Sequence, residues 1–452
     1  MAGTRRGVFI FRRDLRLEDN TGLNRALAEC DEVVPAFVFD RAQRGHIYFS
    51  TAAFQFMLEG LQSLSAQLEE KGGKLYIFTG SPVEILHRLA TGPGIEAVYV
   101  NRDYTPFAQK RDRLLKDRCK VLGLEFNVSS DVLLTEPEQI VTGSGKPYRV
   151  FTPFFKNARQ HSVPRPVPMA SGTLATLDVV GAQSRVAELA MPRALAQRGG
   201  RPHALQVLED VSRFAAYEDG RDMPEFDATT GLSAHNKFGS VSIREFFWAI
   251  ADGLGKDHPL IRQLFWRDFY THIAFHFPHV FGRAFHGKYD GVRWDWNERR
   301  FSSWCHGRTG FPIVDAGMRQ LNATGFMHNR VRMIAASFLV KDLHVDWRRG
   351  EQYFANQLVD YDPSVNNGNW QWAASTGCDA QPYFRIFNPW RQQEKFDRDC
   401  RYIRRWVPEL SDLTAKQIHG LEKRPTYRPD SYPEPMVEHS EESEVAKTRM
   451  RV

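Results

Sequence analysis

The sequence predicts two dissimilar domains, a doubly wound, Rossmann-like α/β domain followed by an all-helical one. Short apolar runs alternate with helical patterns over roughly the first 135 residues, whereas helical patterns dominate from Gln206 onward. All ten tryptophans lie at or after Trp248, which also separates the two halves. We therefore expect an α/β domain at 1–135, an interdomain linker at 136–205, a helical domain at 206–440 and a charged tail at 441–452.

Four apolar runs predict the strands of the first domain, at residues 8–11, 33–39, 74–78 and 97–100. From Ala52 to Lys71 apolar residues recur at spacings of three and four, which predicts a helix. Strands that alternate with helices form parallel sheets, which bind ligands beyond the carboxyl ends of their strands. The chain has neither a G-x-G-x-x-G motif nor a Walker loop, so a conventional dinucleotide or NTP site is not supported.

The linker is predicted from the extended run Pro164–Pro168 and the many small residues after it, with Ala182–Leu195 compatible with a helix. In the second domain, helical patterns span residues 243–254, 259–277, 313–323, 329–343 and 350–358. The tail after Ser440 is charged, and we expect it to be frayed.

Composition narrows the class of protein. No apolar run approaches the ~18 residues that span a membrane, and the N-terminal apolar stretch is too short for a signal peptide. The five cysteines are scattered without a C-x-x-C pair, which argues against a zinc or iron–sulfur site and favours a reduced, cytoplasmic protein. A net charge of +6 leans weakly toward a polyanionic partner.

Two polar motifs permit both a structural and a functional interpretation. The segment Phe11–Asn20 carries six charges after the first strand, where it forms either a solvated loop or part of a ligand site. On the helix that begins at Pro259, Gln263, Trp266, Arg267 and Tyr270 share one face. Such a stripe packs into a core or lines a polar-rimmed pocket.

The segment from Asp360 to Trp372 is the densest signal in the chain. It combines two carboxylates, several amides and two tryptophans, and its Asn-Gly sequence is typical of turns. Tryptophans at this density favour stacking against a flavin or a nucleobase. Arg319, Arg330 and Arg332 either snorkel beside an apolar helix or hold a phosphate or carboxylate.

Together these motifs resemble the cryptochrome/photolyase family, most closely its microbial class I cyclobutane-pyrimidine-dimer photolyases. The resemblance extends from Phe11 to Asp397 and is most specific in Trp266–Tyr270, Gly325–Met333 and Asn366–Gly377. It implies that the helical domain binds FAD in a U-shape. It also implies a deoxyribodipyrimidine photolyase, a carbon–carbon lyase that uses blue light and reduced FAD to split pyrimidine dimers in single- or double-stranded DNA.

The resemblance further implies roles for individual residues. The diphosphate of FAD is held by Tyr217, Thr229, Thr230, Gly231, Leu232 and Ser233. The family usually has Arg or Lys where Gly231 stands, so any contact from this position is made by the backbone. The flavin is lined by Arg267, Asn329, Arg332, Asp360, Asp362 and Asn366, the last of which faces flavin N5.

Other residues are implied in electron supply and in lesion binding. Trp370, Trp347 and Trp294 match the family's electron-transfer chain. The lesion, flipped out of the duplex, is bound by Trp266, Trp372, Met333 and Gln263, and nearby phosphates by Arg221 and Arg330. Dimer photolyases usually carry Glu at the position of Gln263. An amide donates a hydrogen bond but supplies no proton, so we expect slower repair than in a Glu enzyme.

Two alternative functions remain open within the family. A cryptochrome photoreceptor usually has a long C-terminal extension, and here the chain after Leu410 is short. A (6-4) photolyase places histidines where Asn329 and Met333 stand. The resemblance also allows an antenna chromophore in the α/β domain, either a folate, a deazaflavin or a second flavin, lined by Phe11, Arg12, Asp40 and 103–107. We expect a monomer.

Overall fold

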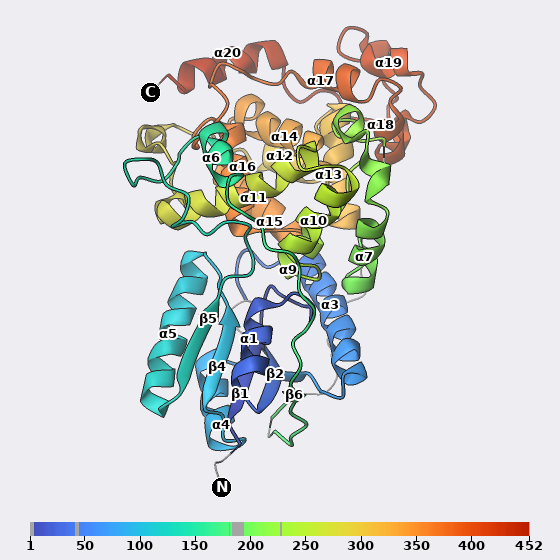
Figure 1. Cartoon of the computed structure of the whole chain (residues 1–452). Helices are drawn as coiled ribbons and strands as arrows, with labels where there is room; N and C mark the ends of the chain where they lie inside the picture. The colour runs from blue at the N-terminus through green and yellow to red at the C-terminus, as the bar shows by residue number, and fades with distance from the viewer. Residues whose placement is uncertain (1–3, 41–44, 180, 183–193, 227, 452) are drawn as a thin grey trace. The chain divides into compact units, whose positions relative to one another are not determined.

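The computed structural model describes residues 4–40, 45–179, 181–182, 194–226 and 228–451. The chain forms two compact units (Figure 1). Unit 1 comprises residues 1–193, 197–215 and 230–276, and unit 2 comprises residues 194–196, 216–229 and 277–452. The helices between residues 230 and 276 are thus grouped with the sheet, a different division from the predicted boundary near residue 206.

Unit 1 contains the parallel sheet that the sequence predicts, with strand order β3-β2-β1-β4-β5. Its strands are β1 (Arg6–Phe11), β2 (Glu32–Phe39), β3 (Tyr76–Thr79), β4 (Ala97–Asn101) and β5 (Glu125–Ser129). The short strand β6 (Thr173–Leu174) also pairs with β2, and all of these pairings are parallel. The predicted fold class is therefore confirmed. β5 escaped prediction because, as an edge strand, it is mostly half-buried or exposed.

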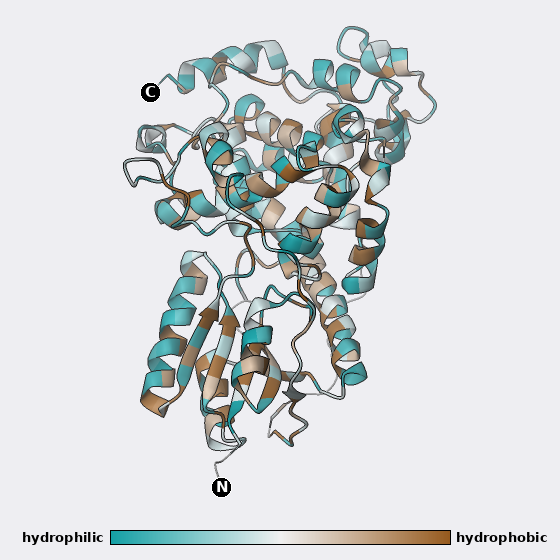
Figure 2. Ribbon diagram, viewed as in Figure 1, coloured by the Kyte–Doolittle hydropathy of each residue, from teal (hydrophilic) through white to brown (hydrophobic). Residues whose placement is uncertain are grey.

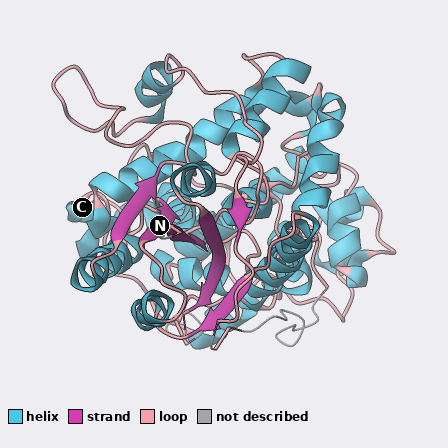
Figure 3. Ribbon diagram, turned by 60° about the horizontal axis from the view of Figure 1, so that its bottom comes forward, coloured by secondary structure: helices cyan, strands magenta, loops and turns pink. Residues whose placement is uncertain are grey.

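Helices flank this sheet (Figure 3), namely α1 (Thr21–Glu29), α3 (Thr51–Glu70), α4 (Pro82–Thr91) and α5 (Pro106–Leu122). The side chains of Asn20, Ser50 and Thr105 cap the N-termini of α1, α3 and α5. Leu86 of α4 and Leu115 of α5 pack with the strands in one buried cluster. Figure 2 shows brown strands between helices whose outer faces are largely teal, as expected for a sheet buried under amphipathic helices.

The rest of unit 1 is helical. It consists of α6 (Phe151–Ala158), α7 (Arg201–Glu209), η2 (Val211–Phe214), α9 (Ser233–Phe238), α10 (Ile243–Gly253) and α11 (Pro259–His276). α10 begins with a capping box formed by Ser242 and Glu245. The predicted linker therefore carries regular elements, α6 and β6. Most of the stretch considered as a linker helix, 183–193, falls outside the described residues.

The charged loop after β1 is buried, so its interpretation as a solvated loop is wrong. Arg16 is 1% exposed and its guanidinium lies 2.7 Å from the Asp131 carboxylate. Arg244 of α10 contacts both Asp19, at 2.8 Å, and Asp131, at 2.9 Å. Buried charges persist only when they are paired. This part of the loop therefore joins the sheet to α10 instead of facing solvent.

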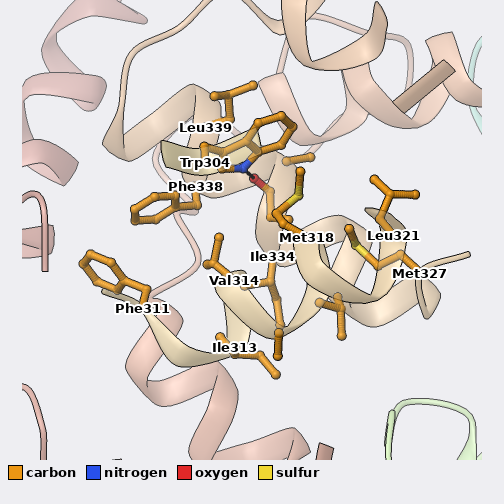
Figure 4. Close-up of a cluster of buried hydrophobic side chains, with 14 of the residues drawn as sticks. Trp304, Phe311, Ile313, Val314, Met318, Leu321, Met327, Ile334, Phe338 and Leu339 are labelled. Carbon is orange, nitrogen blue, oxygen red and sulfur yellow. Dashed lines mark hydrogen bonds between the residues drawn. The ribbon is translucent and has the colours of Figure 1, made fainter. Parts of the chain in front are cut away.

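Apart from the isolated bridge between Asp295 and Val345, the regular elements in the described residues of unit 2 are helices. It contains α8 (Tyr217–Gly220), η3 (Pro278–Val280), η4 (Gly287–Gly291), α12 (Glu298–Cys305), α13 (Pro312–Thr324), α14 (Asn329–Ser337), η5 (Phe338–Asp342), α15 (Trp347–Gln357), α16 (Pro363–Ala374), α17 (Pro389–Phe396), α18 (Arg401–Trp406), η6 (Pro408–Leu410), α19 (Ala415–His419), η7 (Pro425–Tyr427) and α20 (His439–Arg449). Its core surrounds Trp304, which is fully buried beside Met318 and Leu339 (Figure 4). The helix predicted over 329–343 is α14 continued by a π-helical turn, η5.

The prediction of a frayed C-terminal tail is wrong, because α20 packs against the rest of unit 2. The imidazole of His344 lies 2.7 Å from the Glu442 carboxylate, and Arg449 lies 2.8 Å from Asp295. Ala446 is 2% exposed. In the described part of the chain, no helix has both the length and the apolar character that a membrane crossing requires.

Candidate functional site

An ion pair in unit 2 joins α14 to the segment before α16. The Arg332 guanidinium donates to Asp360 Oδ2 over 2.9 Å and to the Met327 carbonyl over 2.7 Å. The Asp360 side chain is 5% exposed, and its second oxygen, Oδ1, is buried without a hydrogen-bond partner in the structure. A buried carboxylate oxygen without a partner is costly. Asp360 therefore presents an acceptor that suits an N–H or O–H group of a bound molecule.

The segment predicted as a turn-rich loop is largely the helix α16, so that prediction is wrong. Asp362 is its N-cap and accepts from the backbone N–H groups of Ser364, over 3.0 Å, and Val365, over 3.2 Å. Pro363 occupies the first helical turn, where its missing N–H costs nothing. These two start signals outweigh the turn preference of Asn-Gly, and the helix places Asn366 and Trp370 four residues apart on one face.

Asn366 and Trp370 are both held against α15. Asn366 is 8% exposed, and its amide nitrogen donates to the Glu351 carbonyl over 3.1 Å. Trp370 is 2% exposed and lies over Gly350, where an added Cβ would stand 2.2 Å from Trp370 Cη2. The Asn366 amide is thus oriented by one backbone bond, which leaves its carbonyl oxygen and second N–H for another partner.

Asn329 and Met333 share a face of α14. The Asn329 amide nitrogen lies 3.8 Å from the Met333 sulfur, and Asn329 is exposed. The neighbouring Arg330 points elsewhere, because it forms an ion pair of 2.8 Å with Asp222 and lies over the Phe396 ring. Arg319 is also committed, through two bonds to the Glu409 carboxylate, which removes it as a phosphate ligand.

In unit 1, α11 presents Gln263, Trp266 and Arg267 on one partly exposed face, as predicted, whereas Tyr270 is only 5% exposed. The Trp266 ring stacks on Phe151 of α6, with centroids 3.6 Å apart and planes at 6°. Arg267 donates to the Val132 carbonyl over 2.8 Å. One face of the Trp266 indole is therefore covered by protein.

Two residues that support α11 were not singled out from the sequence. Phe151 lies in the predicted linker, and its aromatic-rich surroundings were the only signal for it. Asp268 is 1% exposed and accepts from the N–H groups of Leu134, over 2.8 Å, and Thr135, over 3.2 Å. Burial raises the pKa of Asp268 to about 7. The sequence signal for Asp268 was its position within a run of aromatic residues, where a carboxylate is expected to be buried and hydrogen-bonded.

The run from Thr229 to Ser233, predicted to hold a diphosphate, leads into α9. Gly231 has a φ of 63°, in the left-handed region that glycine tolerates best, which suits the absence of a side chain there. The Thr230 hydroxyl accepts from the Leu232 N–H over 3.4 Å, and Ser233 is the first residue of α9. In unit 2, Tyr217 is 9% exposed and Arg221 lies over its ring. Burial raises the pKa of Tyr217.

The expected antenna-lining residues follow strands of the sheet. Arg12 comes after β1 and forms an ion pair of 2.9 Å with Asp112, but its Nη2 is buried without a hydrogen-bond partner. Burial, followed by the nearby Arg111, lowers the pKa of Arg12 to about 10. Asp103, after β4, lies 3.4 Å from Arg13. Arg12 thus has one donor that a bound acceptor could satisfy.

Comparisons with known proteins agree with these features. The family model described as DNA photolyase matches residues 7–171, and the one described as the FAD binding domain of DNA photolyase matches residues 260–452. The chain is 37% identical to a deoxyribodipyrimidine photo-lyase of Agrobacterium fabrum, over 96% of this chain and 95% of that protein.

Solved structures are similar along the whole chain. An archaeal photolyase from Sulfolobus tokodaii, whose crystal structure holds two FAD molecules, is 42% identical, with a TM-score of 0.89 over 98% of this chain and 99% of that one. A cryptochrome from Synechocystis is 27% identical, with a TM-score of 0.90 over 99% of this chain and 100% of that one. The chain therefore belongs to the cryptochrome/photolyase family and contains the FAD-binding domain of DNA photolyases.

Proposed function

We propose that this protein is a light-driven lyase that splits cyclobutane pyrimidine dimers in ultraviolet-damaged DNA. The observation that carries this proposal is the pair of Asn329 and Met333 on α14, with the Asn329 amide nitrogen 3.8 Å from the Met333 sulfur. A soft apolar sulfur and a neutral amide suit an uncharged dimer. Neither side chain is an imidazole, which repair of the (6-4) lesion requires at these positions. The named relative acts as a deoxyribodipyrimidine photo-lyase, which supports the same substrate.

The residues of unit 2 fit FAD. The buried, unpartnered Asp360 Oδ1 suits a donor group of the cofactor, and Arg332 holds the carboxylate in place through an ion pair of 2.9 Å. Asn366 would offer its amide to flavin N5 while its nitrogen remains bonded to the Glu351 carbonyl. Bound FAD in its reduced form supplies, on light absorption, one electron that opens the dimer and is then returned. We assign further FAD contacts to Tyr217, Thr229, Thr230, Gly231, Leu232, Ser233, Arg267, Asn329 and Asp362.

Two side chains of α11 suit recognition of the lesion. Phe151 covers one face of Trp266, whose side chain is partly exposed, and we assign the opposite indole face to a base that has left the duplex. Gln263 lies on the same face of α11 and donates an N–H to a carbonyl of the dimer. We assign a second stacking surface to Trp372. Arg221 and Arg330 bind DNA phosphates, and Arg330 does so in competition with Asp222.

The test combines the purified FAD-bound protein, ultraviolet-irradiated oligothymidine and blue light. We expect thymine absorbance to recover only under illumination. Absence of recovery, with FAD shown to be bound and reduced, would contradict repair and favour the second candidate, a photoreceptor. That candidate is kept because the Synechocystis cryptochrome has a TM-score of 0.90 to this chain. Dark incubation and unirradiated oligothymidine serve as controls.

We also propose a second flavin as the antenna chromophore, bound beside Arg12 in the α/β domain. The buried Arg12 Nη2 has no partner in the structure, and the Sulfolobus tokodaii photolyase holds two FAD molecules. Release of flavin by denaturation should yield two flavins per chain, whereas a folate or deazaflavin would appear as a different absorption spectrum. An Arg12→Met variant should retain only one flavin.

A monomer in the cytoplasm is our further proposal. All five cysteines are free and buried, as expected where thiols stay reduced. Light scattering on the purified protein should give a mass near 52.0 kDa, and a mass twice as large would contradict the monomer.

A further inference from the structure

An unbroken series of aromatic contacts leads from Trp370 to the surface of unit 2. The Trp370 ring lies 6.2 Å from Trp304, and Trp304 lies 6.0 Å from Phe301, with the latter two planes only 21° apart. Phe301 in turn lies 5.4 Å from Trp296. Trp296 is 54% exposed. Because electron transfer slows steeply as the gap between rings grows, a series of rings in contact is a favourable route.

This series does not pass through Trp347. Among the described residues, no direct ring contact joins Trp347 to Trp370. The Arg348 guanidinium also lies 4.7 Å from the Trp347 ring centre. A cation over an indole disfavours removal of an electron from it. No such cation is found over Trp304 in the described structure.

The surroundings of Trp304 favour passing an electron vacancy onward. Trp304 is fully buried, and its indole N–H donates to the Ala335 carbonyl over 3.0 Å (Figure 4). A carbonyl oxygen is too weak a base to take that proton, so an oxidised Trp304 keeps its charge. The hydroxyl of the nearby Tyr353 lies 2.8 Å from the side-chain oxygen of Asn322 and 2.9 Å from the Cys305 carbonyl oxygen, and both are equally poor acceptors for its single proton. Neither ring is therefore a stable end point.

Trp296 has the properties of an end point. Its exposure gives the indole access to water as a proton acceptor. The Arg349 guanidinium lies 5.1 Å from its ring and, like Arg348 beside Trp347, opposes the radical cation. At Trp296, unlike at the buried Trp347, release of the indole proton to water removes that repulsion. Loss of the proton to water makes the step hard to reverse.

We propose that Trp304 and Trp296 form a second electron-supply branch, which runs beside the one expected through Trp347 and rests on the function proposed above. Trp370 gives one electron to the light-excited flavin and receives one from Trp304. Trp304 then receives one electron from Trp296 across Phe301, which serves as a bridge and is not oxidised. Trp296 releases its indole proton to water. An external thiol returns one electron and one proton to Trp296.

The decisive experiment removes the other branch first. The FAD-bound Trp347→Phe variant, with oxidised flavin, is excited by a blue laser pulse, and the visible absorbance of tryptophan radicals is followed. We expect a long-lived neutral radical in Trp347→Phe and a several-fold loss of it in Trp347→Phe/Trp296→Phe. Trp347→Phe/Trp406→Phe is the matched control, because Trp406 in α18 is outside this series, and should behave like Trp347→Phe.

Peptide mass spectrometry gives an independent readout. After prolonged illumination in air without thiol, oxidation products should accumulate at Trp296 in Trp347→Phe and should disappear when Trp304→Phe is added. Because Trp304 is fully buried, flavin content, circular dichroism and the thermal midpoint are measured for the Trp304→Phe variant to show that it is folded. Trp296 is 54% exposed, so we expect Trp296→Phe to disturb the core less.

The branch is refuted if Trp347→Phe shows no long-lived radical, or if Trp296→Phe leaves it unchanged. Failure of the proposed function looks different, because dimers then persist under light although radicals still form at Trp296.

Discussion

Gly350 lies where α15 meets α16, and its replacement by alanine tests the packing that positions Trp370. An added Cβ would stand 2.2 Å from Trp370 Cη2 and 2.5 Å from Leu339 Cδ2. Both neighbours are buried in the core of unit 2, so neither moves without displacing others. We therefore expect the upper half of the roughly 1–3 kcal/mol that overpacking costs.

The same substitution has an opposing effect. Alanine favours a helix interior over glycine by about 1 kcal/mol. The net expectation for Gly350→Ala is a loss of about 1 kcal/mol or somewhat more in the free energy of unfolding, as the difference between these two effects. Without the clash, Gly350→Ala would raise the free energy of unfolding. The sign of the measured change therefore shows whether the clash exists.

Urea unfolding of the flavin-free protein, followed by circular dichroism, measures this difference. Gly287→Ala is the matched control, because nothing lies within 4 Å of its added Cβ and it should change stability by less than about 0.5 kcal/mol. Adding Trp370→Phe, which removes Cη2, should recover part of the loss. A Gly350→Ala variant as stable as the wild type or more so would refute the close approach of Trp370 to α15.

Three further predictions concern α11 and the ion pair of unit 2. Gln263→Glu should increase the quantum yield of dimer repair, because the acid donates a stronger hydrogen bond to the dimer carbonyl; an unchanged or lower yield in the oligothymidine assay contradicts our assignment of Gln263. Asp360→Asn should weaken retention of FAD several-fold during gel filtration, because Arg332 loses its ionic partner, and equal flavin content would show that Asp360 does not contact the cofactor. Asp268→Asn should abolish a pH dependence of the free energy of unfolding. The pKa of Asp268 is 3.8 in the unfolded chain and about 7 in the folded protein, so between these values the folded state retains a proton that the unfolded state loses. The stability of the wild type therefore falls as the pH rises from about 4 to 7. Urea midpoints across that range should fall for the wild type relative to the variant, and parallel curves would contradict the buried, proton-binding Asp268.

The elements with strong local signals were predicted well from the sequence. The apolar runs correspond to β1 to β4, and the helix patterns at residues 52–71 and 259–277 correspond closely to α3 and α11. These predictions hold because each strand or helix buries the side on which its own repeat places the apolar residues. The α16 segment was misjudged for a local reason: the cap by Asp362 and the position of Pro363 outweigh Asn-Gly as a turn former.

The family motifs along the chain were sufficient to indicate a flavin-dependent, light-driven enzyme, since each motif is local and specific. What they left open depends on residues far apart in sequence. The buried charges of Arg16 and Arg244 meet Asp131 across more than 100 positions, and no pattern in the loop after β1 distinguishes that network from a solvated loop. Phe151 beneath Trp266 and the contacts from Trp370 to Trp296 are likewise products of packing. A sequence period specifies which side of an element is buried, but the neighbour it is buried against is decided only when the whole chain is folded.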